Sequence, residues 1–319
     1  MKAAIYSANG SPEVFRVVEL PDPQPGPGEV LVAIEAISIE GGDLLARRSV
    51  APAVPPRVKG YAAAGRVLAL GEGVSRPAVG DRVTAFAFDG SHASLRVVPA
   101  DHCWAMADTL SMEVAAAALI TFGTAALALD LAGTRCGDTV LVTGAAGGVG
   151  IATIQLAAQM GARGIGTGSS AASLSGLARF GLSDGVVIGE GSLDDQVHAL
   201  LGGQGVDSVI DNIGGQSVKD GLAALNDGGR LVLVGLFDGD VHRISPVNLL
   251  LRRLTVAGCF LGPIIAQPRI SAMIDDVLAR LASGGLEQPI DSCFTLDDVV
   301  AAHTRAEGRG RIGRVVMTV

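Results

Sequence analysis

A short glycine-rich segment between an apolar stretch and a helix-forming stretch limits most strongly what this chain can fold into. Residues 139–151 read TVLVTGAAGGVGI, and Ala145, Gly147 and Gly150 have the G-x-G-x-x-G spacing with alanine in first place. A lone match is weak, but this one follows an apolar strand and opens a helix, which is the required context. Bare backbone at Gly147 lets a pyrophosphate approach the helix N-terminus, and Gly150 permits close helix–strand packing. The segment predicts a dinucleotide-binding loop rather than a glycine-rich turn that serves packing alone. The residues expected to contact phosphate are Gly144, Ala145, Ala146, Gly147, Gly148, Val149 and Gly150.

Downstream of this loop, apolar stretches alternate with helix-forming stretches. The expected strands are 140–142, 164–167, 186–188, 208–210, 231–234 and 256–260, and the expected helices are 149–160, 171–180, 193–201 and 218–225. Such alternation is typical of an α/β domain with a doubly wound parallel sheet and helices on both faces. Strands buried on both faces read as continuous apolar runs, which fits the 49% hydrophobic content of the chain.

The first hundred residues show short strands separated by turn residues, without helices between them. The expected strands are 2–6, 15–19, 29–37, 65–70, 82–87 and 93–98. This spacing predicts a β-rich, barrel-like unit. A long helix is expected from Ser111 onward, and the C-terminal part predicts helices at 270–282 and 296–307 before a last strand at 315–319. We therefore expect a discontinuous β-rich domain that encloses the α/β domain.

Charge and hydropathy exclude several classes of protein. A net charge of −8 and a pI near 5.1 argue against binding to nucleic acid. The uncharged run 114–129 is shorter than the roughly 20 residues that span a bilayer, and the N-terminus lacks the apolar core of a signal peptide. We therefore expect a cytoplasmic protein that binds neither nucleic acid nor a membrane.

The end of the second strand of the α/β domain indicates which dinucleotide would bind. An NAD site usually places Asp or Glu there, where the carboxylate accepts from the ribose 2′-hydroxyl. Residues 166–170 read GTGSS and contain no acid, and the hydroxyls of Ser169 and Ser170 can accommodate a 2′-phosphate. The pattern favours NADPH and leaves NADH possible. The alternative is that the two serines cap the following helix, and this role is compatible with cofactor binding.

Several further segments resemble one family along the whole chain. They are MKAAI at 1–5, PDPQPGPGEVLV at 21–32, VGDRV at 79–83, GGRLVLVG at 228–235, A-H-x-x-x-E at 302–307 and GRVV at 313–316. Together with the loop at 140–150, the chain resembles the zinc-independent branch of the medium-chain dehydrogenase/reductases. Within that branch it is similar to the NADPH quinone oxidoreductase and enoyl-reductase group. The resemblance implies a GroES-like β-barrel domain over residues 1–121 and 263–319 and a Rossmann domain over residues 122–262.

Zinc-dependent members of the family differ from this chain at the metal-binding positions. They carry a cysteine where this sequence has Glu40, and a His-Glu pair where it has Tyr61 and Ala62. The four cysteines of the chain form no C-x-x-C pair, which argues against the family's structural zinc lobe. Because a catalytic zinc needs about three protein ligands, we expect no metal.

The expected absence of a metal restricts the chemistry. A simple alcohol does not easily lose hydride without a Lewis acid, whereas quinones and α,β-unsaturated carbonyls are already electrophilic. They need mainly positioning against the nicotinamide and a proton. We therefore expect an NAD(P)H-dependent reductase of a small-molecule quinone, enone or enoyl substrate. The alternative is a non-redox tailoring enzyme of cyclase type, or a nucleotide-binding sensor, on the same fold. This alternative arises because Glu40 replaces the Asn of many enone reductases and residues 44–52 lack their Tyr.

Three residues are candidates for catalytic contacts. Tyr61 matches the wall of the family's active site, where it would donate a proton or a hydrogen bond, or else only pack. Glu40 would act as an acid or base or contact the substrate; alternatively its carboxylate is exposed or paired with Arg47 or Arg48. Asp43 matches a position that the family keeps, and a structural role in a turn is the alternative.

The resemblance also implies contacts outside the phosphate loop. The expected cofactor residues are Thr121 and Thr124 beside the nicotinamide, Asn212, Gly235, Leu236 and Phe237 at strand ends, Phe260 and Leu261 near the carboxamide, and Arg309 on the adenosine phosphate. The lysine of many NADPH-binding relatives is Ser173 here, so Arg309 would compensate. Pairing of strand 255–260 across a homodimer is a further family expectation. The five histidines form no evident cluster, and we expect His303 on a helix surface or at a cap.

Overall fold

The computed structural model describes residues 1–50, 58–236 and 244–319, which form two compact units. Unit 1 comprises Met1–Gly123 and Gly262–Val319, and unit 2 comprises Thr124–Leu261. The predicted domain limits, after residues 121 and 262, stay predictions, because compactness alone does not establish which parts fold independently.

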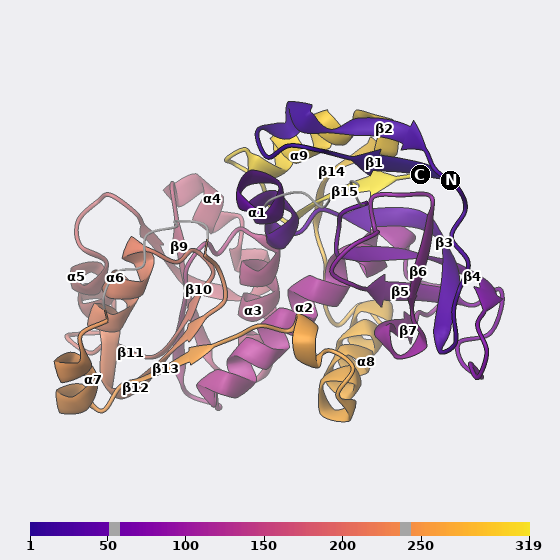
Figure 1. The fold of residues 1–319 in the computed structure, drawn as a ribbon. Helices are drawn as coiled ribbons and strands as arrows, with labels where there is room; N and C mark the ends of the chain where they lie inside the picture. The colour runs from indigo at the N-terminus through magenta and orange to yellow at the C-terminus, as the bar shows by residue number, and fades with distance from the viewer. Residues whose placement is uncertain (51–57, 237–243) are drawn as a thin grey trace. The chain divides into compact units, whose positions relative to one another are not determined.

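Unit 2 contains a parallel sheet with the strand order β10-β9-β8-β11-β12-β13 (Figure 1). The order reverses between β8 and β11, and doubly wound sheets bind ligands at the carboxyl ends of their strands at such a point. The doubly wound fold expected from the sequence is confirmed. The strands are β8 Thr139–Val142, β9 Arg163–Gly168, β10 Leu182–Val187, β11 Val206–Asp211, β12 Leu225–Leu233 and β13 Thr255–Gly258.

The helices of unit 2 connect these strands. They are α3 Gly148–Gln159, α4 Ala171–Ser175, α5 Leu193–Leu200, α6 Gln216–Ala224 and α7 Pro246–Arg252. Helix α3 packs on β8, β9 and β10, whereas α5 and α6 pack on each other and α6 on β11 and β12. Branched side chains such as Leu141, Ile165, Val209 and Leu231 fill the core between sheet and helices.

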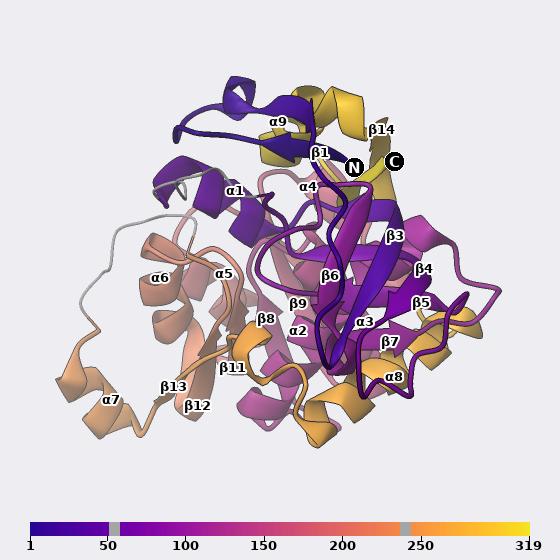
Figure 2. The ribbon, with the colours of Figure 1, turned by 45° about the vertical axis from the view of Figure 1, so that its right-hand side comes forward.

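Unit 1 is built around a mixed sheet with the order β14-β15-β3-β4-β5-β7, in which β6 also pairs with β3. A separate antiparallel pair, β1 and β2, lies beside α9, and both chain termini lie close to it (Figures 1 and 2). The strands are β1 Lys2–Ile5, β2 Arg16–Glu19, β3 Glu29–Ser38, β4 Ala62–Leu70, β5 Arg82–Phe86, β6 Leu95–Pro99, β7 Cys103–Ala105, β14 Ile290–Thr295 and β15 Arg314–Thr318. The helices are α1 Gly41–Ser49, α8 Pro268–Ala282 and α9 Val299–Glu307.

Two elements of unit 1 were missed in the sequence and matter for the site. Helix α1 follows β3 after two residues, and Asp43 in its first turn accepts a hydrogen bond from the backbone N–H of Glu40. Strand β14 pairs in parallel with the C-terminal strand β15 and so joins the sheet from a distant part of the chain. Their sequences lack the periodicity that marks the longer elements. Capping positions α1, and pairing with β15 positions β14.

Helix α2, Met112–Ala132, runs from unit 1 into unit 2 and is longer than the uncharged run predicted from the sequence. Its length and composition would suffice to cross a membrane, although 72% of its most apolar window is buried within the structure. A core helix meets the same criteria, so the expectation that the protein binds no membrane stays a prediction.

Candidate active site

The phosphate loop lies at the carboxyl end of β8, as the sequence predicted. Gly144 has a φ of 60°, and Gly147 stands at the N-cap of α3 in an extended conformation. The first N–H that bonds back within the helix is that of Ile151, which donates to the Gly147 carbonyl at 2.9 Å. The N–H groups of the preceding first turn therefore lack an intrahelical acceptor and, with the helix dipole, favour a phosphate.

Gly150 is the glycine that the loop geometry requires. A Cβ at this position would lie 2.6 Å from the carbonyl oxygen of Gly144 and 2.7 Å from that of Ala145. A Cβ at Gly147 would meet only the Gly144 oxygen, at 3.3 Å. Gly150 thus allows α3 to press against the loop itself.

A buried carboxylate holds the neighbouring loop after β11 in position. Asp211 accepts hydrogen bonds from Thr143 Oγ1 and Ser217 Oγ at 2.6 Å and from the Gly214 N–H at 2.9 Å. The side-chain amide of Asn212 donates to the Thr143 carbonyl at 2.9 Å, and its buried Oδ1 has no partner within the described structure. The network ties the ends of β8 and β11 together beside the phosphate loop.

Gly235, which follows β12, packs closely against the backbone of Asn212 at the end of β11. A Cβ there would lie 1.9 Å from the carbonyl oxygen of Asn212, so only glycine permits this approach. Leu236 is 63% exposed, and the predicted contact Phe237 lies outside the described residues. Asn212, Gly235 and the phosphate loop are therefore neighbours at the edge where β8, β11 and β12 end.

The end of β9 carries Ser169 and Ser170, both exposed. Ser170 caps α4 by accepting the backbone N–H of Ser173 at 3.2 Å. The capping alternative is thus confirmed for Ser170. The preference for NADPH that these serines suggested stays a prediction.

The remaining predicted cofactor residues lie in different surroundings. In unit 2, Thr124 and Leu261 are buried and Phe260 is 65% exposed. In unit 1, Thr121 is fully buried and shares its hydroxyl between the helix carbonyl of Ala117, at 2.8 Å, and Gln288 Oε1, at 2.6 Å. Arg309 is exposed.

Unit 1 contains a buried polar cluster that we name the Glu40 cluster; it consists of Ser38, Glu40, Asp43 and Arg314. Glu40 Oε1 accepts from Ser38 Oγ at 2.7 Å, and Oε2 lies 2.6 Å from Arg314 Nη2. The expectation that Glu40 is otherwise exposed or paired with Arg47 or Arg48 is wrong. Glu40 is 3% exposed, and both of those arginines pair with Glu307 instead.

Asp43 is the titratable member of this cluster. Its Oδ2 accepts the Glu40 N–H at 2.8 Å, whereas Oδ1 is buried and has no partner in the described parts of the chain. Burial raises the pKa of Asp43 to about 8 against the lowering effect of the Glu40 N–H, and the Glu40 carboxylate raises it further. Asp43 therefore holds a proton at neutral pH, in addition to its structural role in the turn.

Tyr61 lies against the first turn of α1. A Cβ on Gly42 would come within 2.3 Å of the Tyr61 ring, so glycine makes room for it. The ring also contacts Phe86 and Phe88 edge-on at 6.1 and 5.8 Å between centroids. Burial, followed by the charge of Asp43, raises the pKa of Tyr61 to about 12. The side chain both packs and stays protonated, and its catalytic role stays a prediction.

The histidines are not dispersed as expected. His92 Nε2 and His303 Nε2 lie 2.9 Å apart, both rings are fully buried, and His92 Nδ1 lies 3.1 Å from Ser91 Oγ. The expected surface or capping position of His303 is wrong, because α9 turns this residue inward against Phe15. Burial lowers the pKa of His92 to about 3 and that of His303 well below its usual range.

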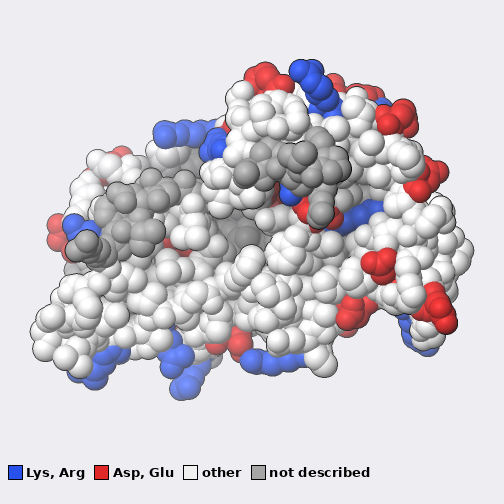
Figure 3. Space-filling model, in the orientation of Figure 1, with Lys and Arg blue, Asp and Glu red and all other residues white. Residues whose placement is uncertain are grey.

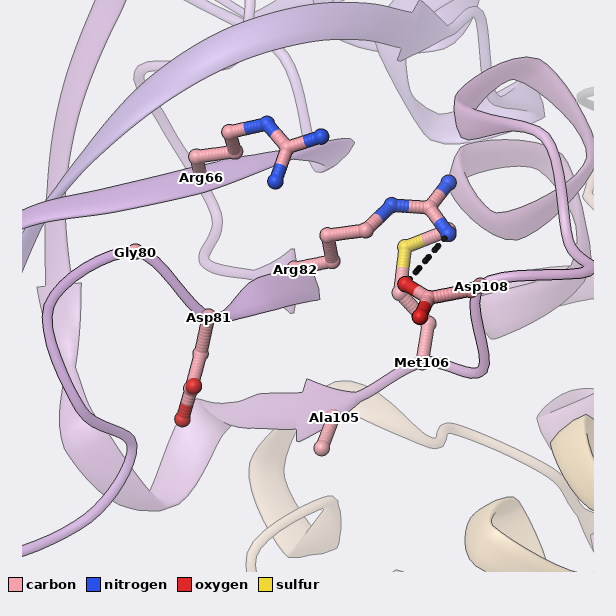
Figure 4. A pocket seen from close by; sticks show the side chains of 7 residues that line it. All are labelled: Arg66, Gly80, Asp81, Arg82, Ala105, Met106 and Asp108. Atoms are coloured by element: carbon pink, nitrogen blue, oxygen red, sulfur yellow. Dashed lines mark ion pairs between the residues drawn. The ribbon is translucent and has the colours of Figure 1, made fainter.

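A surface cavity of about 300 Å³ lies away from these residues, between β5 and the turn after β7 (Figure 4). Arg82 extends across it and lies 3.5 Å from Asp108, and it also donates to the carbonyls of Ala107 and Leu110. Arg66 pairs with Glu35 at 3.1 Å. Because both guanidinium groups are already engaged, the cavity offers little to an anionic ligand.

Within residues 1–50, 58–236 and 244–319, no group of three His, Cys, Asp or Glu side chains is arranged to hold a metal ion. Sequence reasoning also missed Arg314, which was considered only as part of the GRVV motif. The signal that could have identified it is a lone arginine directly before the apolar strand expected at 315–319.

Comparisons with known proteins agree with this geometry. The model of the alcohol dehydrogenase GroES-like domain matches residues 26–129, and that of the zinc-binding dehydrogenase matches residues 148–279. Quinone oxidoreductase-like protein 2 of Bos taurus is 31% identical over 314 residues, covering 95% of this chain and 89% of its own. The synaptic vesicle membrane protein VAT-1 homolog of Homo sapiens is 27% identical over 315 residues, covering 92% and 80%.

Two solved structures are also similar over 100% of both chains. A mycobacterial protein complexed with NADPH has a TM-score of 0.94 at 31% identity, and Escherichia coli quinone oxidoreductase complexed with NADPH has a TM-score of 0.94 at 26% identity. The fold and the loop thus define a dinucleotide-binding α/β protein with a GroES-like unit. The chain belongs to the medium-chain dehydrogenase/reductase family, as its motifs predicted, and its general class is that of an oxidoreductase.

Proposed function

We propose that the protein is an NADPH-dependent reductase that transfers hydride to a quinone or an α,β-unsaturated carbonyl compound without a metal. The observation that carries the proposal is the phosphate loop at β8 and α3, combined with the absence of an acid at the end of β9. The unpartnered Oδ1 of Asn212 leaves hydrogen-bonding capacity beside the loop, and the close backbone approach at Gly235 holds the end of β12 next to it, which fits a bound dinucleotide. Similarity to proteins complexed with NADPH adds support.

Different residues of unit 2 would contact different parts of the cofactor. The first turn of α3 would hold the pyrophosphate, and Ser169 and Ser170 would lie at the adenosine ribose. Asn212 and Gly235 lie across the switch point, where the nicotinamide half is expected. The bound cofactor would supply a hydride, and the raised pKa values of Asp43 and Tyr61 in unit 1 keep both side chains protonated at neutral pH.

Arg314 supports the metal-free part of the proposal. Its guanidinium lies 2.6 Å from Glu40, the residue at the position of the zinc-binding cysteine in zinc-dependent relatives. A carboxylate neutralised by arginine is a poor ligand for a divalent cation, because the fixed positive charge repels the ion. Metal analysis of the purified protein tests this point separately.

Fluorescence and absorbance measurements test the proposal directly. Adding NADPH should enhance or blue-shift the nicotinamide fluorescence, and absorbance at 340 nm should then fall when quinones and 2-alkenals are added. Failure to bind either nicotinamide dinucleotide would reject the proposal. A matched titration with NADH measures the preference for the 2′-phosphate.

A non-redox enzyme or a nucleotide-binding sensor is the second candidate. It is favoured by the absence of the usual Asn and Tyr and by the engagement of Glu40 with Arg314. Tight binding of NADPH without turnover over a broad panel of acceptors would support it over a reductase.

We further propose that the protein forms a homodimer through β13. This strand pairs with β12 and is the last strand on its side of the sheet of unit 2. Exposed apolar side chains of α7 lie next to it in sequence, and Figure 3 shows the surface over α7 as largely uncharged. An unpaired edge beside an apolar surface favours self-association. The expected cytoplasmic location stays a prediction.

A further inference from the structure

Asp211, at the end of β11, is a buried carboxylate whose hydrogen-bond partners in the described part of the chain are all neutral. It is fully buried, and it accepts from Thr143 Oγ1 and Ser217 Oγ at 2.6 Å and from the Gly214 N–H at 2.9 Å. None of these donors carries a charge that offsets the carboxylate, and burial of such a charge is costly. Stabilisation of the fold alone therefore does not account for this residue.

The carboxylate fixes the direction of the Thr143 hydroxyl. A hydroxyl has one hydrogen and two lone pairs. Because the hydrogen points to Asp211 Oδ1, the lone pairs can accept, and the Asn212 N–H donates to Thr143 Oγ1 at 2.9 Å. The side-chain amide of Asn212 donates to the Thr143 carbonyl at the same distance. Asp211 thus holds the residue that follows it through Thr143, which directly follows β8.

The same carboxylate holds the other end of the loop that follows β11. Its Oδ2 accepts the Gly214 N–H, and Gly214 has a φ of 84°, which glycine adopts without strain. A Cβ at Gly214 would lie 2.8 Å from the carbonyl oxygen of Gly235, so this end also packs against the residues after β12. Asp211 therefore fixes both ends of residues 212–214, which we name the 212–214 loop, through groups of unit 2 alone.

The 212–214 loop lies where a doubly wound sheet binds its ligand. The strand order reverses between β8 and β11, and ligands bind at the carboxyl ends of the strands at such a point. The loop after β8 is the phosphate loop, and the two loops touch. A Cβ on Gly144 would lie 3.1 Å from Ile213 Cδ1 and 3.8 Å from Asn212 Cβ. The 212–214 loop thus borders the phosphate loop on the side of β12.

We propose that Asp211 is a positioning residue for the dinucleotide, because it holds the 212–214 loop in the conformation that receives the nicotinamide half. This inference rests on the proposed function. The adenosine half is expected at the end of β9, on the other side of the phosphate loop, so the two halves depend on different segments of unit 2. A loop that the protein itself holds in place loses little conformational freedom when the cofactor binds, which increases affinity.

The charge of Asp211 by itself would act in the opposite direction. A carboxylate bonded to Thr143, the residue before Gly144 of the phosphate loop, repels a pyrophosphate. Removing the charge alone should strengthen NADPH binding, whereas releasing the 212–214 loop should weaken it. Asp211→Asn does both with little change in shape, because one end of the amide is a donor and cannot accept as the carboxylate does. We expect the loss of position to dominate and NADPH to bind about tenfold more weakly.

Substitutions of Thr143 test the same network without changing the charge. Thr143→Val removes the hydroxyl, so Asp211 loses a donor and the Asn212 N–H loses its acceptor, and NADPH should bind about tenfold more weakly. Thr143→Ser keeps the hydroxyl and should bind NADPH within about threefold of the wild type. The control for loss of a buried hydroxyl is Thr84→Val in unit 1, where Oγ1 donates to the Ala115 carbonyl at 3.0 Å.

Binding of 2′,5′-ADP, which carries only the adenosine half, separates positioning from general damage. Calorimetric titration should show that Asp211→Asn and Thr143→Val bind 2′,5′-ADP within about threefold of the wild type, although both bind NADPH about tenfold more weakly. A structural role would not produce this difference between the two ligands. A parallel loss of affinity for both ligands would mean that unit 2 as a whole is disturbed, and it would overturn the inference.

Hydrogen exchange of the wild type without cofactor needs no substitution. If Asp211 holds the 212–214 loop, the N–H groups of Asn212 and Gly214 should exchange about a hundredfold or more slowly than in an unfolded chain. Rapid exchange of both groups would overturn the inference, even if a substituted chain failed to fold.

Failure of the proposed function and failure of this inference give different results. If the wild type binds neither NADPH nor NADH, the proposed function is rejected and the role of Asp211 falls with it. If the wild type binds NADPH and Thr143→Val binds it as tightly as Thr143→Ser, only the inference is overturned. Tighter NADPH binding by Asp211→Asn would show that charge outweighs position, which also overturns the inference alone.

Discussion

Gly150 determines how closely α3 can approach the phosphate loop. Replacing it with alanine would place a Cβ 2.6 Å from the Gly144 oxygen, so the helix and the loop must separate. We expect Gly150→Ala to lower the free energy of unfolding by about 1–3 kcal/mol and to weaken NADPH binding about tenfold or more. Urea unfolding and fluorescence titration measure the two effects. The control is Gly164→Ala in β9, where a Cβ would meet no atom within 4 Å. Equal NADPH affinities of the two variants would contradict the argument.

The buried pair of His92 and His303 makes stability depend on pH. Its neighbours Arg96 and Arg47 are cationic and oppose protonation, in addition to burial. The folded pKa values lie below the unfolded value of about 6.5, so the unfolded chain binds protons first and stability falls as the pH decreases. At pH 5 the loss should reach about 2 kcal/mol for each histidine that stays neutral.

Urea unfolding at several pH values between 7 and 5 tests this prediction, because it measures how the free energy of unfolding changes with pH. The double variant His92→Phe with His303→Leu removes both titrating groups, so its free energy of unfolding should change much less over the same range. Parallel pH profiles for the variant and the wild type would show that other groups cause the acid sensitivity.

Residues that act through neighbours in the chain could be predicted, and residues that act through distant partners could not. The phosphate loop is contiguous, so its spacing and its flanking elements were visible together. His92 and His303 are 211 residues apart, and Arg314 and Glu40 come from the two ends of unit 1. Neither pair leaves a local pattern, and only the meeting of β15 with β3 and α1 brings Arg314 to Glu40.

Among the elements, α1 and α9 are joined by a buried ion pair. Arg47 on α1 is fully buried and donates to Glu307 on α9 and to the Gly10 carbonyl, while Arg48 lies 3.1 Å from the other oxygen of Glu307. Glu307→Gln would leave the Arg47 charge uncompensated, and we expect it to lower the free energy of unfolding by about 3 kcal/mol. Chemical denaturation measures this loss.

Arg48→Ala is the matched control, because the side chain of Arg48 is 51% exposed. Its removal should cost about 1 kcal/mol or less, as is usual for an exposed ion pair. If Glu307→Gln lowered the free energy of unfolding by no more than Arg48→Ala does, the result would mean that solvent reaches the Arg47 guanidinium.

Long apolar elements were the easiest to predict. The strands of unit 2 and the helix beginning near Ser111 carry enough consecutive apolar residues to be recognised alone, and their order predicts the doubly wound sheet. Short elements such as β7 and α1 owe their conformation to pairing and capping by other segments, as with Asp43 on the Glu40 N–H. The candidate catalytic residues of unit 1 depend on these short elements, which is why sequence patterns described their surroundings less completely than those of the phosphate loop in unit 2.

At the scale of the whole molecule, the exposed edge of unit 2 predicts a dimer. Leu250 and Leu251 on α7 are 77% and 69% exposed, and β13 is the edge strand that follows them. Pairing of two β13 strands would satisfy their free backbone groups and cover these leucines. A dimer would bury Leu250 and Leu251 of both copies, and burial of these four side chains would contribute about 6 kcal/mol or more to the free energy of association. Replacing them with glutamate should therefore weaken association more than about a thousandfold.

Sedimentation of the wild type at micromolar concentration should therefore show a dimer, and that of the double variant Leu250→Glu with Leu251→Glu a monomer. The control is Leu68→Glu on β4 of unit 1, where the side chain is 48% exposed and the substitution should not affect association.

NADPH titration of the monomeric variant then separates cofactor binding by unit 2 from dimer formation by unit 2. The phosphate loop is built within one chain by β8, α3 and Asp211, so cofactor affinity should stay within about threefold of the wild type. A monomeric wild type, or a double variant that still sediments as a dimer, would exclude this edge as the interface. Loss of NADPH binding upon dissociation would instead mean that a second copy helps to shape the cofactor site.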